Sequence, residues 1–163
     1  MMKLRRFIER ASQQIDVAFA KTGLVPSHYQ VVAMSGHVAV VPFPDTDDKD
    51  RAAAIMREFF AANPTQRYLF IAEAWTLDSS KEEGPTLSIL ERDGVQSISA
   101  HPRRREVVMF TAEDRDEGML LGLRTIIRPH EGKPYLGPFE LDEPETMEGR
   151  MVGLLPRAQP LPS

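Results

Sequence analysis

The chain of 163 residues contains no cysteine. This absence excludes a disulfide scaffold, thiolate ligands for zinc and cysteine nucleophiles together, and it is typical of proteins in a reducing compartment. A zinc site would have to use His or carboxylate ligands, and no spacing of such residues predicts one. We therefore predict neither a metal nor a cofactor, and the composition favours a cytoplasmic location.

The sequence also has no long apolar run. No stretch approaches the roughly 20 residues that a membrane-spanning helix needs. The N-terminus starts with basic side chains, but Glu9, Arg10, Gln13 and Gln14 interrupt the apolar segment that a secretory signal requires. With 20 basic and 24 acidic side chains the net charge is −4, so the chain has no general attraction for nucleic acid. Neither a membrane nor nucleic acid is an expected partner.

Common enzyme signatures are missing as well. The sequence has no phosphate-binding loop, no G-x-G-x-x-G, no H-E-x-x-H and no nucleophile elbow. Its length suits one domain with a sizeable core. The sequence thus predicts a folded domain without indicating its activity.

The apolar periodicity predicts an α+β fold. Helical spacing indicates an amphipathic helix over residues 3–20 and a second helix beginning near Asp48, where a cluster of aspartates is better suited to capping than to binding calcium. We expect a mainly antiparallel sheet of about five strands, with both helices on one face. The predicted strands are Tyr29–Met34, His37–Val41, Arg67–Trp75, Glu106–Ala112 and Met119–Ile127.

The composition changes after residue 128. Seven of the 13 prolines lie in residues 129–163, which largely excludes regular helix there. This segment still carries apolar side chains, including Phe139, Leu154 and Leu155, so it is too apolar for a freely solvated tail. We predict a core domain of residues 1–128 and an irregular proline-rich segment of residues 129–163. That segment docks on the core or on a partner subunit, and could mediate self-association or bind another protein.

One strand contains a carboxylate among apolar side chains. By alternation Glu73 shares a face with Leu69, Ile71 and Trp75. Glu73 either pairs with an arginine such as Arg105 or Arg124, reaches water, or acts as a general base or polar anchor in a pocket. Trp75 either lines that pocket or packs.

A dense basic cluster, His101-Pro-Arg-Arg-Arg105, ends the long connection 76–104, in which a short helix over Thr86–Arg92 is possible. The three adjacent arginines, Arg103 to Arg105, could bind a phosphate or a carboxylate, with His101 as a catalytic acid or base. Alternatively, adjacent arginines at the start of a strand point to opposite faces and make ordinary surface pairs. The connection itself is a candidate lid or contact segment.

Several short stretches together form a further pattern: Glu73-Ala-Trp75, His101-Pro-Arg103, Arg105-Glu-Val-Val-Met-Phe110, Ala112-Glu-Asp114, Gly149-Arg150 and Leu154-Leu-Pro156. This pattern resembles small bacterial and phage-encoded proteins of unknown function. The resemblance covers about the C-terminal two thirds of the chain. It implies a bacterial or phage origin and brings no activity or catalytic residue with it.

Two functions are consistent with these observations. The first is a non-catalytic interaction or accessory module that binds a protein partner or itself. The second is a small hydrolase or phosphate-handling enzyme that uses Glu73 and His101, with Trp75, Arg103 and Arg105 in the ligand site. The enzyme requires these groups to converge on one concavity, whereas the module does not.

Overall fold

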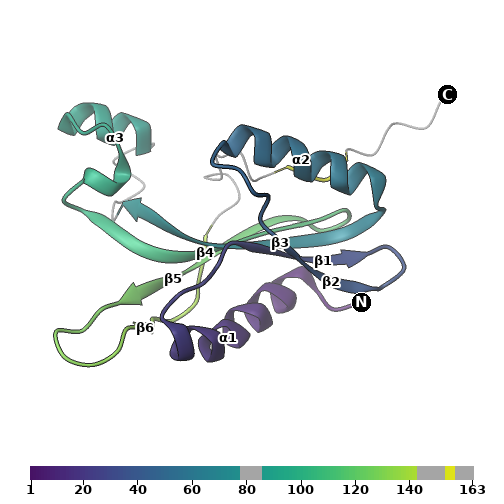
Figure 1. The fold of residues 1–163 in the computed structure, drawn as a ribbon, viewed down its shortest axis with the longest axis horizontal. Helices are drawn as coiled ribbons and strands as arrows, with labels where there is room; N and C mark the ends of the chain where they lie inside the picture. The colour runs from purple at the N-terminus through teal and green to yellow at the C-terminus, as the bar shows by residue number, and fades with distance from the viewer. Residues whose placement is uncertain (78–85, 143–152, 157–163) are drawn as a thin grey trace.

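The computed structural model describes residues 1–77, 86–142 and 153–156 (Figure 1). Its helices are α1 (Leu4–Thr22), α2 (Lys49–Ala62), α3 (Thr86–Asp93) and a 3-10 turn, η2 (Ile98–Ala100). Its strands are β1 (His28–Ala33), β2 (Val38–Pro42), β3 (Thr65–Leu77), β4 (Arg104–Asp114), β5 (Gly118–Ile127), β6 (Tyr135–Leu136) and β7 (Glu140–Asp142). Among these residues no helix is long and apolar enough to cross a bilayer.

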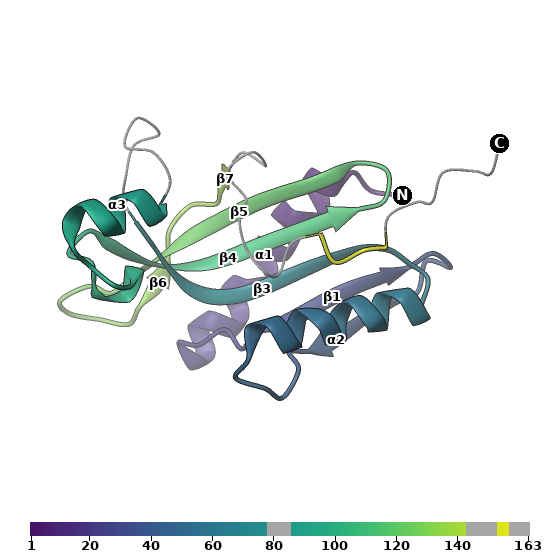
Figure 2. The same cartoon turned by 90° about the horizontal axis from the view of Figure 1, so that it is seen from above.

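The strands form one curled antiparallel sheet in the order β2-β1-β3-β4-β5-β6, with β7 also pairing with β5 (Figure 2). All five predicted strands are present, and β6 and β7 are additions that the sequence did not predict. The long pair at the centre runs from Arg67 opposite Asp114 to Leu77 opposite Arg104. Gly36 and Gly118 take positive φ angles of 92° and 82° in the two hairpin turns, a conformation that favours glycine.

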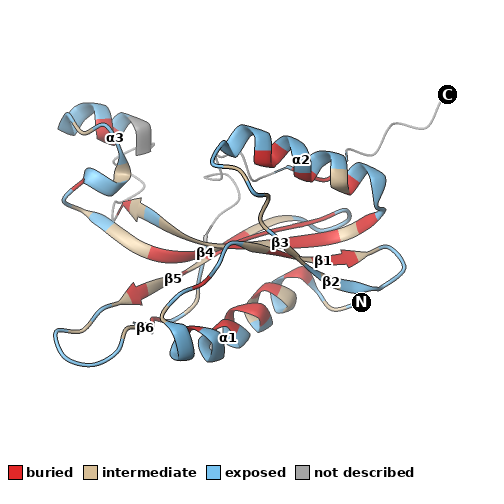
Figure 3. Cartoon of the chain, viewed as in Figure 1, coloured by how far each residue is buried: buried red, intermediate tan, exposed pale blue. Residues whose placement is uncertain are grey.

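The two long helices lie on opposite faces of the sheet, so the prediction that both cover one face is wrong (Figure 1). Leu69 and Ile71 of β3 pack in the core under α1, whereas the neighbouring Tyr68 and Phe70 pack in the core under α2. Because the central strands are apolar on both sides, each face of the sheet has to be covered by a helix or another element. Figure 3 shows the buried positions of both helices turned toward the sheet. We call the two sides the α1 face and the α2 face.

Two buried arginines attach α1 to the sheet. Arg67 donates from Nε to Asp114 (2.7 Å) and from Nη1 to the carbonyl of Met2 (2.7 Å). Arg124 donates to the carbonyl of Ser12 (2.8 Å) and pairs with Asp16 (2.9 Å). Both arginines are at least nine-tenths buried. A guanidinium in such a position is stable only when its donors are matched, so these bonds determine where the helix lies.

The capping prediction for α2 is confirmed. The Asp48 side chain accepts hydrogen bonds from the N–H groups of Asp50 (2.9 Å) and Arg51 (3.2 Å) at the start of the helix. The helix then packs Met56 and Phe60 onto an aromatic cluster around Tyr29. Capping of this kind contributes about 1 kcal/mol to helix stability.

The described part of the proline-rich segment packs on the chain's own core. The ring of Phe139 meets Phe110 edge-on at 5.7 Å, directly over Gly122, where a Cβ would collide with it. Leu154 and Leu155 are 1% and 9% exposed and belong to the core under α2. These apolar side chains are therefore used within the same molecule. Met151, Val152 and the last seven residues lie outside the described ranges.

Candidate functional site

Glu73 and Trp75 lie side by side on the α1 face of β3. The register confirms the alternation expected from the sequence, because Leu69 and Ile71 of the same face are buried under α1. Glu73 is half-buried and accepts a hydrogen bond from the N–H of Val25 (3.1 Å), just after the end of α1. Trp75 lies two residues further along the strand and is 42% exposed. The helix thus stops short of Trp75 and leaves part of its ring open to solvent.

Neither arginine that the sequence suggested contacts Glu73. Arg105 pairs with Thr76 in the register and so lies on the α2 face, where it binds Glu140 (2.9 Å). Arg124 is on the α1 face, but Val108 lies between it and Glu73 in the sheet. The prediction of these pairs is wrong because it lacked the register of β4 and β5. Glu73 instead fixes the chain that leaves α1.

A different arginine contacts Trp75. The guanidinium of Arg104 lies over the indole ring, 5.5 Å from its centroid. Its Nη1 also donates to the carbonyl of His101 (3.2 Å), which holds the cation in place. A cation over an exposed indole contributes about 0.5–1 kcal/mol and keeps the ring oriented. Arg104 and Arg105 therefore serve opposite faces, and the arginine triplet does not form one cluster.

An ion pair lies beside the tryptophan in the sheet. Glu106 is the register partner of Trp75, and it accepts two hydrogen bonds of 2.7 Å from Arg128. The Arg128 bonds lower the pKa of Glu106. The same bonds raise the pKa of Arg128, and the negative charge of Glu73 raises it further. Glu73, Trp75, Arg104, Glu106 and Arg128 form one surface region, which we call the Trp75 patch.

The buried ring of His101 is held by hydrogen bonds to neighbouring residues of the protein. Its ring is 2% exposed, and its Nδ1 accepts the N–H of Arg103 (3.0 Å). The proton must then be on Nε2, which donates to Asp93 at the end of α3 (2.8 Å). Bonds from Arg92 and His101 lower the pKa of Asp93 to about 2. The His101–Asp93 bond joins α3 to the start of β4, and both ring nitrogens are occupied.

The residues that the enzymatic hypothesis needs are therefore dispersed. Glu73 and Trp75 lie on the α1 face, Arg105 lies on the α2 face, and the His101 ring is enclosed. The Arg103 backbone holds the His101 ring in its tautomer. Within the described ranges no three His, Asp or Glu side chains gather as metal ligands. Arg105 is thus separated from Glu73 by the sheet, and both ring nitrogens of His101 are already bonded within the protein.

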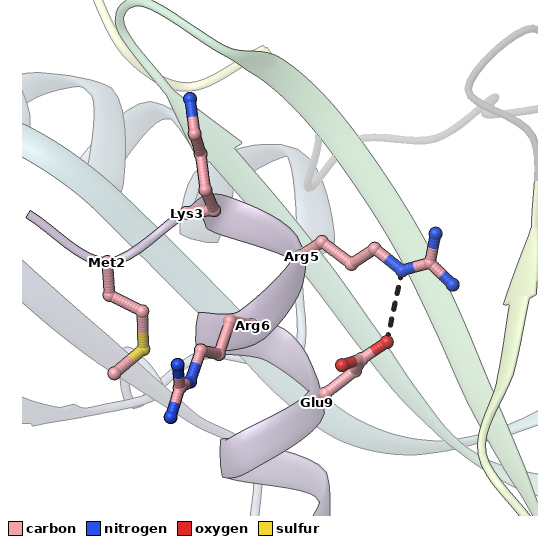
Figure 4. Close-up of a pocket in the computed structure, with 5 residues that line it drawn as sticks. All are labelled: Met2, Lys3, Arg5, Arg6 and Glu9. Atoms are coloured by element: carbon pink, nitrogen blue, oxygen red, sulfur yellow. Dashed lines mark hydrogen bonds and ion pairs between the residues drawn. The ribbon is translucent and has the colours of Figure 1, made fainter.

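Open depressions do occur on the first turns of α1, away from these residues. Lys3, Arg5 and Arg6 line one of them, and Figure 4 shows their side chains pointing in different directions. Arg5 is already paired with Glu9 at 3.1 Å. An exposed pair four residues apart in a helix contributes about 0.3–0.5 kcal/mol. This surface is basic, but its cations do not converge on a common point.

Sequence reasoning missed Glu106 and Arg128 of the Trp75 patch, and it considered Arg104 only as part of a basic cluster that could bind an anion. Arg104 and Glu106 lie at the start of β4 and Arg128 follows β5, and only the strand register and the side-chain contacts show that they lie around Trp75. The chain matches no protein-family model, and no curated protein or solved structure matches it.

Proposed function

We propose that this protein is a non-catalytic interaction module that binds a protein partner through the Trp75 patch. The observation that carries the proposal is the state of Trp75, the only tryptophan of the chain, which is 42% exposed on a sheet face and held under Arg104. Tryptophan and arginine are the residues most enriched among those that dominate binding energy in interfaces. An ordered, exposed indole offers a large contact area at little entropic cost.

The charges of the patch favour a protein partner over a polyanion. Two cations, Arg104 and Arg128, alternate with two anions, Glu73 and Glu106, and the Glu106–Arg128 pair is satisfied internally. Such a surface has no excess positive charge with which to attract a phosphate backbone. A rim of paired charges around an aromatic centre is the usual composition of a protein interface. The partner should therefore present an apolar side chain to the indole, surrounded by polar groups.

The test compares three forms of the protein as bait in an extract of the source cells. Wild type should retain a partner that Trp75→Ala loses, and Tyr135→Ala is the matched control. Tyr135 is also an exposed aromatic residue, 54% exposed, but it pairs with Ile127 of β5, whose side chain lies on the opposite face. The purified partner is then titrated into protein labelled with fluorotryptophan. Because Trp75 is the only tryptophan, a single fluorine resonance should shift on binding.

Two results would contradict the proposal. One is capture of the same partners in equal amounts by wild type and Trp75→Ala. The other is turnover of any substrate that is lost in Glu73→Gln while the variant stays folded, since this would make Glu73 catalytic.

A further inference from the structure

The two edges of the sheet differ in how their strands are paired. On one side, β5 is followed by the short strands β6 and β7. On the other side, β2 is the last strand, and among the described residues only β1 pairs with it. Its sequence, Val-Ala-Val-Val-Pro, has no charged side chain, and Val38 and Val40 are 60% and 68% exposed. Edge strands of monomeric proteins usually carry charges that prevent pairing, so this strand is unprotected apart from its terminal proline.

The hydrogen-bond pattern shows which backbone groups of β2 point outward. Ala33 donates to the carbonyl of His37, and Phe43 donates to the carbonyl of Ser27. Hydrogen-bonded and non-bonded pairs alternate along an antiparallel ladder, so Ala39 and Val41 bond to β1. The N–H and C=O groups of Val38 and Val40, with the carbonyl of Pro42, are then directed away from the sheet. These are also the positions whose side chains lie on the α1 face.

We propose that β2 pairs antiparallel with β2 of a second copy of this chain, around a twofold axis at Val40. Under this symmetry Val40 faces Val40 of the other copy, and the two residues exchange both backbone bonds. Val38 faces Pro42 of the other copy and donates to its carbonyl. Pro42 has no N–H, so each of these outer pairs makes one bond. Four bonds join the strands, and the side chains of Val38, Val40 and Pro42 cover one another across the axis.

The distribution of charge favours a second copy in this orientation. Acidic side chains follow β2 at Asp45, Asp47 and Asp48, whereas the Met34–His37 turn before it contains none. Antiparallel pairing places the acidic connection of each copy near the uncharged turn of the other copy. It therefore separates the acidic groups of the two copies, which matters for a chain with a net charge of −4. The 55% exposed side chain of Met34 would also gain a neighbour at the turn.

The experiment measures mass and amide exchange on the full chain. Light scattering should give twice 18.4 kDa for wild type at high concentration. Val40→Lys should raise the dimer dissociation constant on the order of 100-fold, because the twofold axis repeats the change and sets two lysines opposite each other. Val17→Lys is the matched control, since Val17 is 63% exposed on α1 and should leave the dimer intact.

Amide exchange identifies the strand itself. In the dimer, the Val38 and Val40 amides should exchange as slowly as those of Ala39 and Val41, and in Val40→Lys the Val38 amide should become fast. Val40→Pro removes only the outward N–H and should weaken the dimer without unfolding β2. The proposal would be overturned if the wild-type protein stayed monomeric at all concentrations. This includes the case in which β2 of the monomer pairs with a strand of another protein. A dimer with fast Val38 and Val40 amides, or one unaffected by Val40→Lys, would overturn it as well. Trp75→Ala should dimerise normally, so this test is independent of the Trp75 patch.

Discussion

Asp114→Asn should strongly destabilise the fold, because Asp114 is a buried carboxylate that accepts hydrogen bonds through both of its oxygens. Asp114 uses its two oxygens separately: Oδ1 accepts the turn N–H groups of Asp116 (2.8 Å) and Glu117 (3.0 Å), and Oδ2 accepts Nε of Arg67 (2.7 Å). An asparagine has only one acceptor oxygen. Asparagine can therefore accept either from the turn N–H groups or from Arg67, but not from both. Its NH₂ group then faces the hydrogen-bond donor that has lost its acceptor.

The expected loss is about 3 kcal/mol in the free energy of unfolding. Removing one partner of a buried ion pair costs about 3–5 kcal/mol. The lower end applies because Arg67, whose side chain is 4% exposed, keeps its bond to Glu117 (3.1 Å). For a chain of this size, 1 kcal/mol corresponds to about 2–4 °C in Tm, so Tm should fall by about 6–12 °C. Urea unfolding followed by circular dichroism measures both values.

The pH dependence of stability tests the hydrogen bonds of Asp114 independently. Burial by itself would raise the pKa of Asp114, but bonds from Glu117, Asp116, Gln66 and Arg67 outweigh it, and the pKa is lowered. A carboxyl with a lowered pKa stabilises the fold above its unfolded pKa, and this contribution is lost as the pH falls through its folded pKa. The difference in the free energy of unfolding between wild type and Asp114→Asn should therefore become smaller below about pH 4.

The control is Asp116→Asn, the same exchange two residues away at an exposed position, which should change stability by less than about 0.5 kcal/mol. In the double variant Arg67→Met/Asp114→Asn, the loss should be smaller than the sum of the single losses by about 1–3 kcal/mol. Equal stability of the two Asp→Asn variants, or strict additivity in the double variant, would refute this account of the network.

Three further predictions concern other positions. Glu73→Gln should change stability by less than about 1 kcal/mol, because the amide oxygen can still accept the Val25 N–H; a loss near 3 kcal/mol on thermal melting would indicate a buried ion pair instead. Leu154→Ala, at a side chain that is 1% exposed, should cost about 2–4 kcal/mol in urea, against under about 1 kcal/mol for Leu141→Ala, which is 37% exposed. Burial raises the pKa of Glu113, so its ionised form opposes folding once the pH passes the ordinary glutamate range. Glu113→Gln should accordingly gain stability relative to wild type as the pH rises above about 4.5, and a pH-independent difference would contradict this.

Local patterns predicted most of the elements. Alternation located the two long central strands, helical spacing located α1, and the aspartates before α2 indicated its cap. Each of these features depends on residues close together in the sequence. The short strands β6 and β7 have two and three residues, which is too few for a periodic pattern.

The placement of the helices depends on distant residues, and here the prediction was wrong. Tyr68 and Leu69 are adjacent in the sequence, yet each packs under a different helix. The sequence showed that both sides of β3 were apolar, which already required two covers, but it did not show which helix crosses to which side. The Trp75 patch had the same difficulty. Alternation joined Glu73 to Trp75, whereas Glu106 and Arg128 join them only through the register of three strands.

The attachment of α1 to the distal half of the chain has a consequence for synthesis on the ribosome. The amide of Leu4 is bound by Glu117, 113 residues later, and the carbonyl of Ser12 is bound by Arg124, 112 residues later. When α1 leaves the ribosome, the surface that buries Leu4 and Ile8 has not yet been made. The helix must wait, with its apolar stripe in water, until β4 and β5 emerge. A nascent chain of which only residues 1–77 have emerged from the ribosome should therefore bind holdase chaperones through its first 22 residues, and one of which residues 1–142 have emerged should release them.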